Sequence, residues 1–132
     1  MGGKIVKVGE SIKVNSHAEF LNKVFGTNYK AWMKCVWPSK GNNYGWIVWM
    51  VRFNETHGGF INTFVGKDKD TIKEENLCHV TSWEYRDRKK IVFQVVDHGY
   101  TREYIFRGKF IYDEERDDPL NVRYYHKVSD ML

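Results

Sequence analysis

The alternation of side chains along residues 104–112 constrains the fold more than any other feature of this sequence. Aromatic residues recur at every second position of this stretch and alternate with aliphatic or basic ones. The aromatic set is Tyr104, Phe106, Phe110 and Tyr112, and the intervening set is Ile105, Arg107, Lys109 and Ile111. A period of two is typical of a β-strand with one buried face. Gly108 interrupts the aromatic set and predicts a β-bulge or a bend.

A second period-two pattern predicts a β-hairpin formed by residues 30–37 and 46–53. Pro38 and the polar run after it, residues 39–43, supply the breaker and turn chemistry between the two strands. One face of the second strand is expected to lie in the core. Its members are Ile47, Trp49, Val51 and Phe53.

One short helix is predicted after Ser16, which begins the capping-box pattern S-x-x-E that ends at Glu19. Apolar residues then follow at helical spacing, and Gly26 is placed to end the helix as its C-cap. Further strands are predicted at residues 4–8, 12–14, 60–65, 80–85, 90–97 and 122–128. Residues 67–76 predict a charged loop or one helical turn. The expected inner face of the last strand is Val122, Tyr124, His126 and Val128.

Six or seven strands with one or two short helices predict an α+β fold built on a mainly antiparallel sheet. We expect this sheet to be curled or closed into a small barrel. The chain has 132 residues, about the length of one domain, and no linker divides it. Residues 1–132 are therefore expected to form a single domain.

The basic residues are concentrated in one part of the chain. Residues 1–90 contain 15 Lys and Arg against 9 Asp and Glu, whereas residues 91–132 contain 6 against 8. A basic part of this kind favours an anionic partner, of which nucleic acid is the commonest, although an ordinary solvated surface remains an alternative.

Cysteine usage and hydropathy indicate the compartment. Cys35 and Cys78 lack CxxC spacing, and the N-terminus lacks the apolar segment of a secretory signal. No apolar run reaches the roughly 20 residues that cross a bilayer. We expect a cytoplasmic protein with free thiols and no membrane partner.

Catalytic motifs are scarce. The five histidines fall in separate segments, and neither phosphate-binding glycine motif is present, so no metal and no cofactor are expected. The best nuclease candidate is the group Asp97, His98 and Glu103, with Lys109 on the following strand. A hairpin turn with solvated polar residues explains the same pattern.

Binding residues are more numerous. If the hairpin pairs as predicted, Lys30, Trp32 and Lys34 share a face with Trp46 and Arg52, where rings can stack on bases and cations can meet phosphates. The alternative is that both faces of this hairpin are buried. A second basic group is expected to position a phosphate backbone. Its members are Arg86, Arg88, Lys89, Lys90, Arg107 and Lys109.

The C-terminal stretch REYIFRGKFIYDEERDDPLNVRYYHKVSD resembles the closing strands of β-barrel modules in bacterial restriction and phage-defence proteins. The resemblance implies a PUA-like or SRA-like reader, a fold that often holds a flipped or modified base in an aromatic pocket. Trp32, Trp46, Trp83 and Tyr85 would then be pocket candidates, and no catalytic residue is implied.

We therefore expect a nucleic-acid-binding domain that favours DNA over RNA and acts beside a separate nuclease subunit or domain, as a monomer or a dimer. Two alternatives stay open at this point: a small metal-dependent nuclease, and a protein-interaction domain of a phage or defence system.

Overall fold

A computed structural model describes residues 5–77, 89–116 and 121–132 of the chain. The described part is mostly β-structure. Its elements are β1 (Ser11–Val14), α1 (His17–Phe25), β2 (Val36–Pro38), the 3-10 helix η1 (Gly41–Asn43), β3 (Ile47–Val51), β4 (Thr56–His57), β5 (Phe60–Val65), β6 (Thr71–Asn76), β7 (Lys89–Asp97), β8 (Arg102–Tyr112) and β9 (Val122–Ser129).

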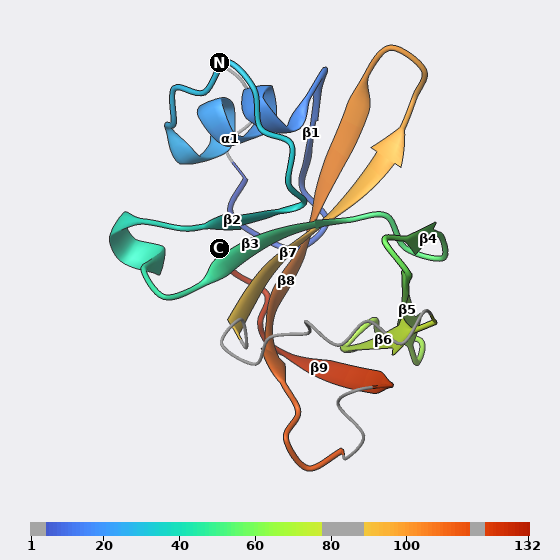
Figure 1. Ribbon diagram of the computed structural model, residues 1–132. Helices are drawn as coiled ribbons and strands as arrows, with labels where there is room; N and C mark the ends of the chain where they lie inside the picture. Colours follow the sequence, from blue (N-terminus) through green and yellow to red (C-terminus); the bar gives the residue numbers. More distant parts are fainter. Residues whose placement is uncertain (1–4, 78–88, 117–120) are drawn as a thin grey trace.

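The strands form one curled sheet with the order β2-β3-β7-β8-β9-β6-β5-β4, and β1 pairs with β8 off this path. Of the strand pairs described, only β3 and β7 run parallel. Figure 1 shows the sheet as a half-barrel, with α1 above β2 and β3 at one side and β4, β5 and β6 at the other. The predicted α+β, mainly antiparallel curled sheet is confirmed.

A β-bulge lies in the middle of β8, the longest strand. Val92 pairs with Gly108 and Phe93 pairs with Phe106, so Arg107 is the extra residue. Because side chains alternate along a strand, one extra residue moves the following positions to the opposite face. The bulge that Gly108 predicted is present, and it changes the face that β8 buries.

Two hydrophobic cores result, one on each face of the sheet. The helix-side core lies under α1 and contains Ile5, Val14, Phe20, Leu21, Trp37, Val48, Met50, Ile91, Phe93, Val95, Tyr104 and Phe106. The inner core fills the curl of the sheet and contains Trp49, Val51, Phe53, Ile72, Val92, Phe110 and Tyr125. Strands β3 and β7 are thus buried on both faces, as the alternative for the hairpin proposed. Four residues of the predicted strand 46–53 were expected in the core. Trp49, Val51 and Phe53 are buried, and Ile47 is only half-buried.

The predicted helix is confirmed at both ends. The Ser16 side chain accepts a hydrogen bond from the Glu19 amide at 3.2 Å, and Glu19 accepts one from the Asn15 amide at 3.1 Å. Gly26 ends α1 with φ 72°, a left-handed conformation that glycine adopts without a steric penalty. Phe20 lies on the buried face of α1 and stacks on Tyr104, with ring centroids 4.2 Å apart.

The predicted strand at residues 30–37 is mostly wrong, because only Val36–Pro38 joins β3. The segment before it is held by side chains instead of a strand ladder. Asn22 in α1 accepts a hydrogen bond from the Tyr29 amide at 2.8 Å and donates one to the Tyr29 carbonyl at 2.9 Å. The Trp32 indole donates to the Val36 carbonyl at 3.2 Å, so residues 32–36 form a closed local turn.

Residues 67–76 were predicted as a loop or helical turn, yet Thr71–Asn76 form β6 between β5 and β9. The expected inner face of β9 is also wrong. Ile72 of β6 pairs with Tyr125, and Glu74 pairs with Arg123, so the odd-numbered residues of β9 point into the curl. The strand predicted at residues 80–85 lies outside the described residues.

Gly108→Ala should lower the free energy of unfolding by about 2 kcal/mol or more, because a methyl group there has no room. Its Cβ would lie 2.9 Å from the Ser129 carbonyl oxygen and 2.7 Å from Lys127 Cδ, at φ +119°. Gly66→Ala is the matched control, since Gly66 also has a positive φ but no atom within 4 Å of the added Cβ. Urea unfolding compares the two variants. Equal losses would contradict a packing role for Gly108.

Candidate nucleic-acid interface

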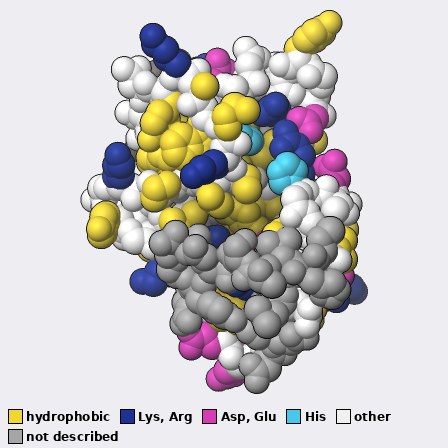
Figure 2. All heavy atoms as spheres, in the orientation of Figure 1, with side chains coloured by type: hydrophobic (Ala, Val, Ile, Leu, Met, Phe, Trp, Pro, Cys, Tyr) yellow, Lys and Arg dark blue, Asp and Glu magenta, His cyan; other side chains and the backbone are white. Residues whose placement is uncertain are grey.

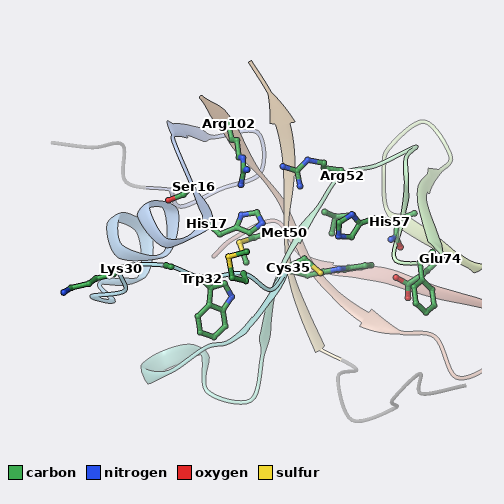
Figure 3. Close-up of a pocket in the computed structure, with 16 residues that line it drawn as sticks. Ser16, His17, Lys30, Trp32, Cys35, Met50, Arg52, His57, Glu74 and Arg102 are labelled. Atoms are coloured by element: carbon green, nitrogen blue, oxygen red, sulfur yellow. The ribbon is translucent and has the colours of Figure 1, made fainter. Parts of the chain in front are cut away.

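A cavity of about 450 Å³ lies between the end of β3, the segment 30–35 and strands β4 to β6. The pairing of β2 with β3 stops at Trp49, so beyond this residue one edge of β3 still pairs with β7 while the other edge faces this space. Figure 3 shows the cavity extending from Lys30 near α1, past Trp32 and Met50, to Glu74 at the far side. The curl of the sheet therefore leaves an opening at the end of the inner core.

A row of polar residues on neighbouring strands begins at the far side of the cavity, where Asn62 and Glu74 line it and Arg123 does not. Asn62 of β5 pairs directly with Glu74 of β6, which pairs with Arg123 of β9. These side chains are 9%, 8% and 3% exposed, respectively. Asn62 Oδ1 has no hydrogen-bond partner among the described residues. A buried amide oxygen without a protein partner costs free energy and can accept a hydrogen bond from a ligand.

Aromatic rings form the adjoining walls. Trp49 is only 5% exposed, and its ring centroid lies 5.5 Å from that of Tyr125. Trp32 belongs to the segment 30–35, where its ring lies 4.8 Å from that of Tyr29. Phe60 at the start of β5 also lines the space. A flat ligand can thus contact rings while its edge meets the polar row.

The mouth of the cavity carries several basic groups. Arg52 donates two hydrogen bonds to the Asp97 carboxylate, at 2.9 and 3.2 Å, and Arg102 lies 3.7 Å from the same carboxylate. The hydrogen bond from Arg52 is the main reason that the pKa of Asp97 is lowered. Lys30 and His57 add exposed groups, and Figure 2 shows basic side chains around a hydrophobic area on this face.

His17 lies behind this mouth at the start of α1. Its Nδ1 is 2.6 Å from the Tyr104 hydroxyl, and its side chain is almost completely buried. Burial, assisted by the nearby charges of Arg102 and Arg52, lowers the pKa of His17 to about 4. The imidazole is therefore neutral at physiological pH and leaves the two guanidinium groups as the cations there.

The predicted binding residues divide into two groups. Lys30, Trp32 and Arg52 line the cavity, whereas Trp46 does not. Trp46 precedes β3, at the end opposite Arg52, and its ring lies 5.7 Å from Lys89 Nζ and 5.2 Å from Lys109 Nζ. The predicted hairpin was expected to place these residues on one face. In the structure they lie on two separate surfaces, one at the cavity and one around Trp46.

Lys90 does not lie on the surface, contrary to prediction. It is 6% exposed, and its Nζ is 5.1 Å from the centre of the Trp49 ring, because Lys90 points into the inner core. Arg107 is half-buried and donates to Gln94 at 2.8 Å, and Lys34 is exposed outside the cavity. Trp83, Tyr85, Arg86 and Arg88 lie outside the described residues.

The side chains of the nuclease alternative are engaged with other groups. Asp97 binds Arg52, while Glu103 accepts hydrogen bonds from Ser11 at 2.7 Å and pairs with His98 at 2.9 Å. Lys109 is hydrogen-bonded to Asn43 at 2.7 Å. Within residues 5–77, 89–116 and 121–132, no three His, Cys, Asp or Glu side chains form a group that could hold a metal ion.

Several cavity residues were missed as site residues from the sequence, among them Trp49, Asn62 and Glu74 as well as Phe60, His57 and Arg102. Trp49 was predicted to be core, and it belongs to both the inner core and the cavity wall. The alternation of Ile72, Glu74 and Asn76 with Thr71, Lys73 and Glu75 was the available signal. This alternation was not recognised as a strand because two of its three inward residues, Glu74 and Asn76, are polar.

The curled, mainly antiparallel half-barrel agrees with the PUA-like or SRA-like class of modules that the C-terminal stretch resembles. This chain belongs to the SET and RING associated (SRA) domain family, whose model matches residues 2–132. No curated protein matches the chain.

A solved structure titled "The 5-Hydroxymethylcytosine-Specific Restriction Enzyme AbaSI" is similar, with a TM-score of 0.71 and 19% sequence identity. The similarity covers 92% of this chain and 40% of that one, so this chain spans less than half of the length of that enzyme. At this level of identity the comparison shows a shared fold.

The resemblance predicted from the C-terminal stretch is confirmed by the family match, and so is the expectation of a DNA-binding domain. In the part of the chain that is described, no helix is long and apolar enough to span a membrane.

The depressed pKa of His17 predicts a specific loss of stability in acid. The unfolded chain binds this proton with a pKa near the ordinary 6.5 and the folded chain with a pKa of about 4. Because the unfolded state binds more protons between these values, the free energy of unfolding decreases as the pH falls through this range. His17 should contribute a loss of about 2 kcal/mol between pH 7.5 and pH 5.

Urea unfolding at these two pH values, compared with the variant His17→Gln, measures this contribution. The variant should lose about 2 kcal/mol less than the unsubstituted protein over this interval. An NMR titration should show one histidine that stays neutral down to pH 5. A His17 resonance that titrates near pH 6.5 would contradict the account.

Proposed function

We propose that the cavity receives a single base extruded from duplex DNA, and that this base is a cytosine modified at its 5-position. The observation that carries the proposal is the unpartnered Asn62 Oδ1, buried beside Glu74 on the inner face of an SRA-family half-barrel. Enzymes and readers that reach a base inside a duplex rotate it into a pocket that contacts its hydrogen-bonding edge. A buried acceptor at the end of an open cavity fits that task.

The polar row matches the edge of cytosine. Cytosine has an exocyclic amine, which donates, and a ring nitrogen and a carbonyl oxygen, which accept. The Asn62 amide can accept from the amine and donate to a neighbouring acceptor, and the Glu74 carboxylate has acceptor sites on two oxygens. Thymine has a carbonyl oxygen in place of the amine, so the Asn62 oxygen would face another acceptor.

The aromatic walls supply stacking. Trp49 is held in place by the inner core, and Trp32 is held by its hydrogen bond to Val36. A base inserted against such rings gains roughly 1–3 kcal/mol. The cavity volume of about 450 Å³ lies within the range of small-ligand pockets and leaves room for a substituent on the base.

The proposal extends to the partners of the domain. We favour DNA over RNA as the partner because the proposed ligand is a modified cytosine that is extruded from duplex DNA. The similar structure is that of a restriction enzyme, and the similarity covers only 40% of it. We infer that this domain acts beside a nuclease, either in a longer chain or as a separate subunit.

Asn62→Leu should separate binding from stability. Leucine has nearly the shape of asparagine, and it removes a buried oxygen without a partner, so the free energy of unfolding should stay equal or increase. Binding to a duplex with one 5-hydroxymethylcytosine should weaken by about tenfold, while binding to the unmodified duplex should change little. Fluorescence anisotropy at fixed salt gives both dissociation constants.

The matched control is Asn42→Leu, the same substitution at an exposed amide in η1 outside the cavity. This variant should bind both duplexes as the unsubstituted protein does. Retention of the preference for hydroxymethylated DNA by Asn62→Leu would contradict the proposed role of the cavity.

A further inference from the structure

Two arginines at the cavity mouth share one carboxylate. Arg52 follows β3, Asp97 ends β7, and Arg102 begins β8 directly opposite Asp97 in the sheet. Arg52 donates hydrogen bonds from Nε and Nη2 to the two carboxylate oxygens of Asp97, and the Arg102 guanidinium lies 3.7 Å from the same carboxylate. Figure 3 shows the Arg52 and Arg102 side chains pointing toward each other above His17. The two cations thus converge on one point at the entrance to the cavity.

The carboxylate is the most exposed member of this cluster. The side chain of Asp97 is 54% exposed, against 23% for Arg52 and 37% for Arg102. Arg102 also lies close enough to the Tyr104 hydroxyl to lower its pKa, against the larger raising effect of burial, and this hydroxyl contacts the buried His17. The two arginine side chains are therefore more enclosed by the fold than the Asp97 side chain, which can turn into water. An exposed ion pair of this kind holds its partners weakly.

We propose that Arg52 and Arg102 form the binding site for a phosphodiester of the extruded nucleotide, and that Asp97 occupies this site in the free protein. This inference rests on the proposed function, because a base in the cavity brings its own phosphates to the mouth. A phosphodiester offers two oxygens to a guanidinium group, as a carboxylate does. Asp97 is thus displaced when DNA binds and returns when it leaves.

The internal carboxylate has two effects. It keeps two neighbouring guanidinium groups compensated while the cavity is empty, and it competes with every phosphate that approaches. A competitor inside the protein leaves the site free in only a fraction of the molecules. The apparent association constant for DNA is the intrinsic constant multiplied by that fraction. The interaction of Asp97 therefore weakens DNA binding even though Asp97 stabilises the free form of the mouth.

The test is Asp97→Asn, with dissociation constants measured for a duplex that contains one 5-hydroxymethylcytosine. Removal of the competing charge should tighten binding by about twofold to fivefold, the range that corresponds to an exposed ion pair. Asp97→Glu retains the carboxylate and should bind as the unsubstituted protein does. Because Asp97 is exposed, both variants are expected to fold, and thermal unfolding verifies this.

Asp130→Asn is the matched control. It removes the same charge from an exposed carboxylate, which pairs with Lys127 at 2.8 Å and lies outside the cavity. A general effect of net charge would tighten DNA binding equally in both variants. Asp97→Asn should tighten DNA binding more than Asp130→Asn does. This additional tightening should vanish when Asp97→Asn is combined with Arg52→Gln.

An equal effect of Asp97→Asn and Asp130→Asn, or weaker binding by Asp97→Asn, would overturn the inference. The second result would mean that Asp97 orients the arginines for DNA. Either result leaves the proposed function intact if the unsubstituted protein still prefers the hydroxymethylated duplex. Absence of that preference in the unsubstituted protein would overturn the proposed function, and the inference with it.

Discussion

The β-bulge at Arg107 determines how the two faces of the sheet are used. Before it, β8 places Phe106 in the core under α1; after it, the same strand places Phe110 in the inner core. The other edge of β8 is divided at the same point, because β1 pairs with its first part and β9 with its last part. One strand thereby joins a helix-covered layer to a half-barrel, and Gly108 provides the space that β9 needs.

The cavity follows from this arrangement. A strand buried on both faces presents Met50 to the helix side and Trp49 to the inner side, so the opening beside β3 has apolar walls from both cores. Strands β5 and β6 then place Asn62 and Glu74 across the gap. The Asn62 amide oxygen lowers stability, because it is buried without a partner among the described residues. Such a cost is expected where side chains are kept for a ligand.

Local signals in the sequence predicted the elements whose pattern and chemistry agree. The helix from Ser16 to Gly26 and the strand containing Tyr104 were recognised because capping, spacing and apolar content all indicate the same structure. Prediction failed where a polar residue occupies an inward position, as at Glu74 in β6, which was taken for part of a loop. It also failed where distant contacts decide, because no local pattern reveals that Asn22 holds the segment before β2 or that Lys90 is buried.

A crystal structure of the protein bound to a duplex with one 5-hydroxymethylcytosine tests the central claim most directly. The account predicts that the modified base has left the duplex and lies in the cavity against Trp49, with its amine facing Asn62 and Glu74. A complex in which this base remains stacked in the duplex, or lies on the surface around Trp46, would contradict the account.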